Sequence, residues 1–171
     1  LVNNHVFATE NPSSSTQHIV RYDNLDFDGM ISTASADTFY YPYGIFAYDR
    51  HEQSHLFFGQ TSDLSRGGGD GQVTIYDTSA AMLSPVQTIP TEAGGQDRFG
   101  YSLDIKNGLL AVGAPFGDTA GPQAGSVCLF RRSPDGSFIH EENLTAADAE
   151  TEAHFGHAVA ITDGGVIYVS A

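Results

Sequence analysis

Positive charge and cysteine are scarce in this sequence. One lysine and six arginines stand against 21 acidic residues, which gives a net charge of −14 at pH 7. Nucleic acids and anionic membranes are bound through basic patches, so we expect neither as a partner. The single Cys128 excludes a disulfide framework and is predicted to be a small buried thiol. No apolar run approaches the roughly 18 residues of a membrane-spanning helix, so no direct membrane insertion is expected.

Short motifs of common enzyme classes are missing as well. The chain contains no GxSxG elbow, no phosphate-binding P-loop, no GxGxxG and no CxxC. Residues 51–55 do spell HExxH, which binds catalytic zinc when a helix places both histidines on one face. Here the motif lies between two strand-like runs without a helical pattern, so we expect a hairpin loop. A surface metal site is the alternative, and its ligands would be Asp49, His51, Glu52 and His55.

Strand patterns and tight turns are abundant instead. Residues 101–105 alternate between apolar and polar side chains, as a half-buried strand does. Asn107-Gly108 then gives a strong signal for a type I′ hairpin turn. The apolar run LLAVGA at 109–114 is typical of a strand buried on both faces, and residues 125–130 predict a third strand.

These landmarks recur along the chain. An aromatic residue followed by glycine occurs at positions 43, 99 and 155, at intervals of 56 residues. Tyr22, Tyr76 and Phe130 lie 54 residues apart, and HLFFGQ at 55–60 occupies the place of LLAVGA. Self-similarity at such a period is the sequence signature of a repeat architecture. Each period holds four strand-like runs, which is the content of one propeller blade.

Phe99-Gly100 together with Gly113-Ala114-Pro115 resembles the FG-GAP repeat, the unit of integrin-α-type β-propellers. Residues 144–148 (LTAAD) are similar to the segment that ends a blade in the bacterial and protist branch of these repeats. The resemblance implies an all-β fold, a β-propeller of four-stranded antiparallel blades. We expect one propeller segment over 1–171, with blades at roughly 1–42, 43–98 and 99–154 and a partial blade at 155–171. Propellers close with about four to eight blades, so about three blades predict a segment of a larger propeller that does not fold stably alone.

For function, the resemblance implies an extracellular or cell-surface module for protein–protein binding, adhesion or structural assembly, with no catalysis. The expected partners are other proteins, copies of the chain itself, or glycans. Two alternatives remain open: a propeller-based hydrolase or lyase that acts from the central channel, and a glycan-binding propeller. Polar residues of several blades that converge on the channel mouth would indicate an enzyme, whereas unrelated loops would indicate a scaffold.

Partner-binding residues can be proposed by location only. The loops between second and third strands, with those before each aromatic-glycine pair, are expected to crown one face of the propeller. The candidates in these loops are Asp63, Arg66, Asp70, Asp118 and the stretch Glu92–Arg98, which includes Asp97.

Cofactors are not expected, and calcium is the alternative. Asn24, Asp26 and Asp28 alternate ahead of Gly29, as oxygen ligands of Ca²⁺ do in a wrapping loop. The repeat register places them at the turn that Asp135-Gly136 occupies two blades later, and turn chemistry explains an aspartate there.

Two further features receive structural interpretations. His154 and His157 flank Phe155-Gly156, and on a strand this spacing puts them on opposite faces, so no metal pair is expected. Asn143 begins an Asn-Leu-Thr glycosylation sequon, which matters only in a protein secreted by a eukaryote.

Overall fold

The computed structural model describes residues 5–13, 16–23, 32–39, 44–48, 55–61, 71–79, 84–91 and 97–171. This part of the chain consists of strands and turns and contains no helix. No helix that is long and apolar enough to span a membrane occurs in these residues. The described chain is therefore all-β, as predicted.

The described strands form four sheets, and within each sheet the strands that follow one another in sequence pair antiparallel. The first sheet has three strands, the next two have four each, and the last has two. They comprise β1 (His5–Ser13), β2 (Thr16–Asp23) and β3 (Ser32–Phe39); β4 (Gly44–Tyr48), β5 (His55–Gln60), β6 (Gln72–Asp77) and β7 (Ser84–Pro90); β8 (Ser102–Lys106), β9 (Leu109–Ala114), β10 (Ser126–Arg132) and β11 (Phe138–Leu144); and β12 (Ala158–Ile161) and β13 (Ile167–Ser170).

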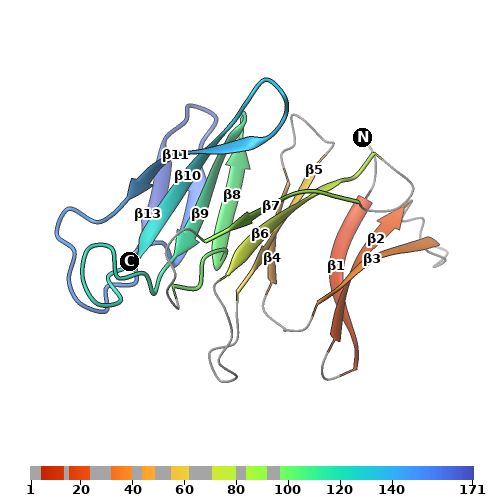
Figure 1. The fold of residues 1–171 in the computed structure, drawn as a ribbon, viewed down its shortest axis with the longest axis horizontal. Coiled ribbons are helices and arrows are strands. Elements are labelled where there is room, and N and C mark those ends of the chain that lie inside the picture. The colour runs from red at the N-terminus through yellow and green to blue at the C-terminus, as the bar shows by residue number, and fades with distance from the viewer. Residues whose placement is uncertain are drawn as a thin grey trace.

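Figure 1 shows these sheets side by side in chain order, with β1–β3 at one end of the row and β12–β13 at the other. The sheets do not close into a ring, which is consistent with a partial propeller. β5 and β9 are the second strands of two equivalent four-stranded sheets, and Gly59 pairs with Val73 as Gly113 pairs with Val127. The predicted equivalence of HLFFGQ and LLAVGA is confirmed.

Turn chemistry follows the sequence where the structure describes it. Asn107 and Gly108 have φ of 50° and 72°, the conformation that a type I′ turn requires. Asp135 lies in the β10–β11 turn and accepts hydrogen bonds from the hydroxyls of Ser133 and Ser137 and from the Ser137 N–H. These donors stabilise the carboxylate and lower the pKa of Asp135 to about 2.

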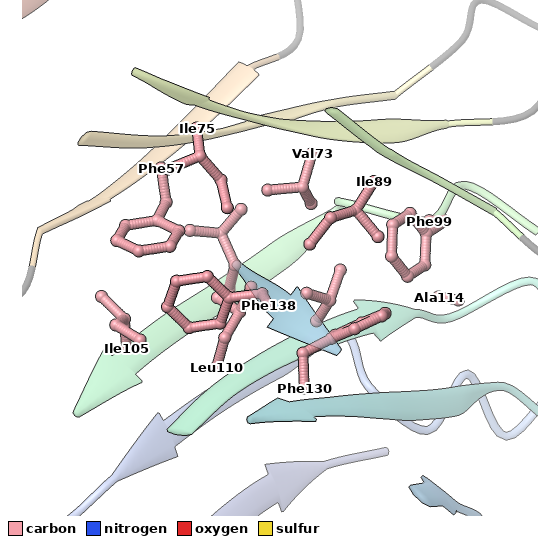
Figure 2. Close-up of a cluster of buried hydrophobic side chains, with 12 residues drawn as sticks. Phe57, Val73, Ile75, Ile89, Phe99, Ile105, Leu110, Ala114, Phe130 and Phe138 are labelled. Carbon is pink, nitrogen blue, oxygen red and sulfur yellow. The ribbon is translucent and has the colours of Figure 1, made fainter. Parts of the chain in front are cut away.

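β9 is buried at all six positions because a sheet packs against each of its faces. Leu110 and Val112 belong to the larger apolar cluster, which lies between the β4–β7 and β8–β11 sheets. Figure 2 shows Phe57 and Ile75 of one sheet directed toward Phe138 of the other. Leu109 and Ala111 belong to the second cluster, with residues of β12 and β13. The lone Cys128 is only half-buried and packs against the larger cluster.

Phe99-Gly100 and Phe155-Gly156 lie where the backbones of neighbouring sheets are in contact. The Phe99 side chain is 2% exposed and belongs to the apolar cluster between two sheets, whereas Phe155 is half-buried. A Cβ on Gly59 would collide with the carbonyl oxygen of Gly100, and one on Gly113 with the carbonyl oxygen of Gly156. Only glycine permits this backbone approach. The contact repeats from one blade boundary to the next.

The first strands of successive sheets are neighbours, since β8 contacts β4 on one side and β12 on the other. Blades of a propeller surround a central channel. The ends of these first strands are therefore the places where side chains of different blades can meet.

Candidate functional site

Two copies of one four-residue turn build the candidate site. In Arg98–Tyr101 the N–H of Tyr101 donates to the Arg98 carbonyl at 3.0 Å, and in His154–His157 the equivalent distance is 3.1 Å. Arg98 and His154 both have φ of 55°, in the left-handed region that side-chain-bearing residues seldom adopt. Such conformations persist where the surrounding structure imposes them, and they concentrate at functional sites.

The last residues of the two turns meet across the blade boundary. Tyr101 precedes β8 and His157 precedes β12, and the Tyr101 hydroxyl lies 3.1 Å from Nε2 of His157. Their ring centroids are 4.9 Å apart. His157 is exposed to solvent. The pair is thus an accessible imidazole oriented by a phenol, an arrangement suited to proton transfer.

The first residues of the two turns share a third aromatic ring. The Arg98 guanidinium carbon lies over the ring of Phe116, 4.1 Å from its centroid, and the His154 ring is 4.6 Å from Phe116. His154 donates from Nδ1 to the carbonyl oxygen of Pro115 at 3.1 Å, since a carbonyl can only accept. All three side chains are half-buried.

Asp97 is buried next to Arg98 and stabilises the turn through hydrogen bonds. Its side chain is only 6% exposed, and its carboxylate accepts hydrogen bonds from Thr91 Oγ1 at 2.7 Å and from the Phe99 N–H at 3.0 Å. Its carbonyl also accepts from the N–H of Phe116. Asp97 therefore fixes the turn before Phe99, while its burial leaves little carboxylate surface for a protein partner.

The other candidates that the structure describes lie apart. Asp118 is exposed in the β9–β10 loop and accepts from the N–H of Gln123 at 2.8 Å. His55 begins β5 and lines an open cavity of about 550 Å³ together with Arg132 and Asp135, at the opposite ends of the strands. Asn143 is exposed on β11 and lies 2.8 Å from His140 Nε2.

The remaining candidates lie outside the described residues: Asn24, Asp26, Asp28, Asp49, His51, Glu52, Asp63, Arg66, Asp70 and Glu92. Among the residues that the structure describes, no three histidines, cysteines or carboxylates are grouped so as to hold a metal ion.

Sequence reasoning placed Arg98 in a candidate loop without a role, missed Tyr101 and Phe116, and considered the two histidines only as a possible metal pair. In the structure His154 packs on Phe116 and His157 on Tyr101. The signal was present in the repeat, because Arg98 and His154 are 56 residues apart, as are Tyr101 and His157. The copy that comes first in the chain has Pro42 and Ile45 at these two places and therefore lacks polar side chains there.

Comparison with known proteins supports the repeat and the fold. Residues 87–130 match the model of the FG-GAP repeat. The structure is similar to the periplasmic gluconolactonase of Pseudomonas aeruginosa, a β-propeller, with a TM-score of 0.62 and 18% identity. The match covers 98% of this chain and 46% of that protein, so the chain spans less than half of its length. No curated protein matches the sequence.

This similarity corrects two expectations from the sequence. The chain was predicted to be a non-catalytic adhesion or assembly module, yet the propeller that it resembles in structure is an enzyme. At 18% identity the likeness shows the fold alone. The FG-GAP repeat accordingly indicates a propeller and does not indicate adhesion, because one fold serves many functions.

Proposed function

We propose that the chain supplies part of the active-site face of a propeller hydrolase that opens the ring of a sugar lactone. The observation that carries the proposal is the meeting of Tyr101 and His157, from two neighbouring blades, at 3.1 Å. Catalysis on a propeller needs such convergence of polar groups, whereas a passive scaffold does not. The similarity to a gluconolactonase supports a hydrolase over a lyase and suggests the substrate class.

His157 is the proton acceptor in this proposal, and Tyr101 orients it. With Nε2–H donating to the Tyr101 oxygen, Nδ1 accepts a proton from water. The water oxygen bonds to the lactone carbonyl carbon, the bond from that carbon to the ring oxygen breaks, and the ring oxygen takes the proton that His157 holds. Lactone and water thus give the hydroxy acid, and the imidazole returns neutral.

We also propose that the protein acts outside the cytoplasm, as the periplasmic location of the similar gluconolactonase suggests. Exposed Asn143 would be accessible to glycosylation in a eukaryotic secretory pathway. Of the partners expected from the sequence, which were proteins, copies of the chain and glycans, this proposal retains a carbohydrate ligand.

The test is lactone hydrolysis by the native protein, measured as proton release above the spontaneous rate in buffer. Glucono-δ-lactone is the first substrate. His157→Ala should lower kcat by about 10²–10⁴-fold, the usual contribution of a general base. Tyr101→Phe keeps the ring and should cost less, because it removes only the group that orients His157.

His140→Ala is the matched control, since His140 lies on β11 beside Phe130 and Asn143, away from the two turns. It should hydrolyse the lactone as the native protein does. Hydrolysis no faster than in buffer, or full activity in His157→Ala, would refute the proposal.

A further inference from the structure

We propose that Arg98, mounted on Phe116, is an anion subsite that selects sugar derivatives carrying a carboxylate. The inference rests on the proposed function, because it names the substrate class of the same site. It starts from the stack of Arg98 on Phe116 at 4.1 Å.

Stacking fixes the guanidinium and leaves its donors available. The five N–H groups of an arginine lie in the guanidinium plane, and a carboxylate is bound bidentately at the edge of that plane. An aromatic ring beneath the carbon of the group contacts its face instead. Phe116 therefore holds Arg98 in place without occupying the donors that a ligand would use.

The other basic side chains that the structure describes have different surroundings. Lys106 pairs with Asp163 at 2.6 Å, and Arg131 pairs with Glu141 at 2.9 Å. Arg132 lies at the opposite ends of the strands, beside the β10–β11 turn. Within the described residues, Arg98 makes no ion pair.

Among the described residues, Asp97 and Asp118 are engaged by hydrogen bonds within their own loops. Asp97 accepts from Thr91 and from the Phe99 N–H, and Asp118 accepts from the Gln123 N–H. Glu150 and Glu152 are exposed to solvent on the loop that leads to His154. Arg98 is half-buried and has no carboxylate partner among the described residues, so in a chain of net charge −14 it is a local positive charge that attracts an anion.

The spacing from Arg98 to the reacting pair suits a sugar acid. Arg98 and Tyr101 are the first and last residues of one turn, closed by a hydrogen bond of 3.0 Å. The end Cα atoms of such a turn lie within about 7 Å of each other. A six-carbon sugar lactone can therefore place a terminal carboxylate at Arg98 while its lactone carbonyl lies at His157.

The first test measures binding without turnover. D-glucarate and the neutral D-glucitol are titrated calorimetrically into the native protein and into Arg98→Gln. We expect glucarate to bind at least tenfold more tightly than glucitol, and Arg98→Gln to remove that preference. Arg98→Lys keeps the charge but not the bidentate edge and should recover only part of it. Arg131→Gln, the same change at an arginine paired with Glu141, should bind glucarate as the native protein does.

The second test compares two γ-lactones, one carrying a carboxylate (glucaro-1,4-lactone) and one neutral (glucono-1,4-lactone). Arg98→Gln should raise KM for the charged lactone at least tenfold, leave its kcat nearly unchanged, and leave both constants for the neutral lactone unchanged. Circular dichroism establishes that each variant is folded, and Phe116→Leu tests the stack if Arg98→Gln is not.

The outcomes separate the two proposals. Glucarate binding that depends on Arg98, without lactone hydrolysis, supports the subsite and refutes the hydrolase. Hydrolysis that depends on His157, with equal preference for charged and neutral ligands, keeps the hydrolase and overturns the subsite. Equal binding of glucarate by native protein and Arg98→Gln also overturns the subsite.

Discussion

The two faces of β8 meet different neighbours. Toward the β4–β7 sheet, Leu103 and Ile105 enter the larger apolar cluster. Toward β12, Ser102 donates to the Gly156 carbonyl at 2.7 Å, and Asp104 accepts from the Ile161 N–H at 2.6 Å. The boundary with the β4–β7 sheet, the apolar boundary, is held mainly by apolar packing. The boundary with the β12–β13 sheet, the polar boundary, has a smaller apolar cluster and these hydrogen bonds in addition.

The two boundaries share one backbone contact and differ in the side chains around it. Both boundaries contain the same backbone approach, Gly59 to Gly100 in one and Gly113 to Gly156 in the other. Only the polar boundary contains Tyr101 and His157. The glycine contacts set the distance between blades, and the side chains around them decide whether a boundary is core or candidate site.

The largest effect is expected from Gly113→Ala. The new Cβ would overlap the Gly156 carbonyl oxygen and the Ser102 Oγ, so backbone must move. Overpacking usually costs about 1–3 kcal/mol when side chains can yield. With backbone as the obstacle, we expect more than that, up to loss of the folded protein.

Gly59→Ala, which meets the Gly100 carbonyl, should behave alike if the two boundaries share one architecture. Gly164→Ala is the control, because its nearest neighbour would be Thr162 Oγ1 at 3.9 Å. Denaturant unfolding measures the free energy of unfolding of the native protein and of the three variants. Equal stability of the Gly113 and Gly164 variants would show that the close approach is not required.

Phe99→Ala should have the next largest effect. The ring is 2% exposed in the apolar boundary and meets Phe130 edge-on, with 6.1 Å between centroids. Removing such a buried ring costs about 3–5 kcal/mol. Phe155→Ala, at the equivalent place in the polar boundary, should cost less because that ring is half-buried. Thermal unfolding measures both, and an equal loss would contradict the distinction between the boundaries.

Asp104→Asn, a change in the polar boundary, should lower the free energy of unfolding by a smaller amount. One carboxylate oxygen accepts from Ile161 and the other from the Ile105 N–H. An amide has only one acceptor oxygen, so one donor loses its partner, at a cost of about 1–2 kcal/mol. Asp118→Asn, in an exposed loop, is the matched control and should change the unfolding free energy little. An unchanged free energy of unfolding in Asp104→Asn would show that apolar packing, and not these hydrogen bonds, stabilises the polar boundary.

The smallest effect is the loss of stability that we expect when Asp135 is protonated in acid. The pKa of Asp135 is about 2 in the folded protein, against an ordinary 3.8. A lowered pKa stabilises the fold above pH 3.8, and this contribution disappears as the pH falls from 3.8 toward 2. The carboxylate is exposed, so the change is small.

Melting curves of the native protein and Asp135→Asn, recorded from pH 5 to pH 2, test this prediction. The two melting temperatures should converge in that interval, because the asparagine has no proton to take up. Curves that stay parallel would show that the Ser133 and Ser137 contacts do not stabilise the ionised turn.

Local patterns were sufficient to predict much of the fold. Alternation predicted the strand in β8, a continuous apolar run predicted the doubly buried β9, and Asn107-Gly108 predicted the turn between them. These features depend on side-chain polarity and backbone conformation within a few residues. The 56-residue spacing of aromatic-glycine pairs then indicated blades, because equivalent residues must return to equivalent places.

The site could not be predicted in the same way. On an isolated strand His154 and His157 would point in opposite directions, and that geometry argued against a joint role. In the structure they are the ends of one turn, and each finds its contact in a part of the chain distant in sequence, Phe116 for His154 and Tyr101 for His157.

The strands, the tight turns and the repeat could thus be predicted from local sequence patterns. Which charged and aromatic side chains meet depends on how the sheets pack in three dimensions. Tyr101 and His157 are 56 residues apart and come within 3.1 Å only because two sheets pack face to face across Gly113 and Gly156. Local periodicity determines which face a side chain occupies, whereas contact across a blade boundary depends on how whole sheets pack.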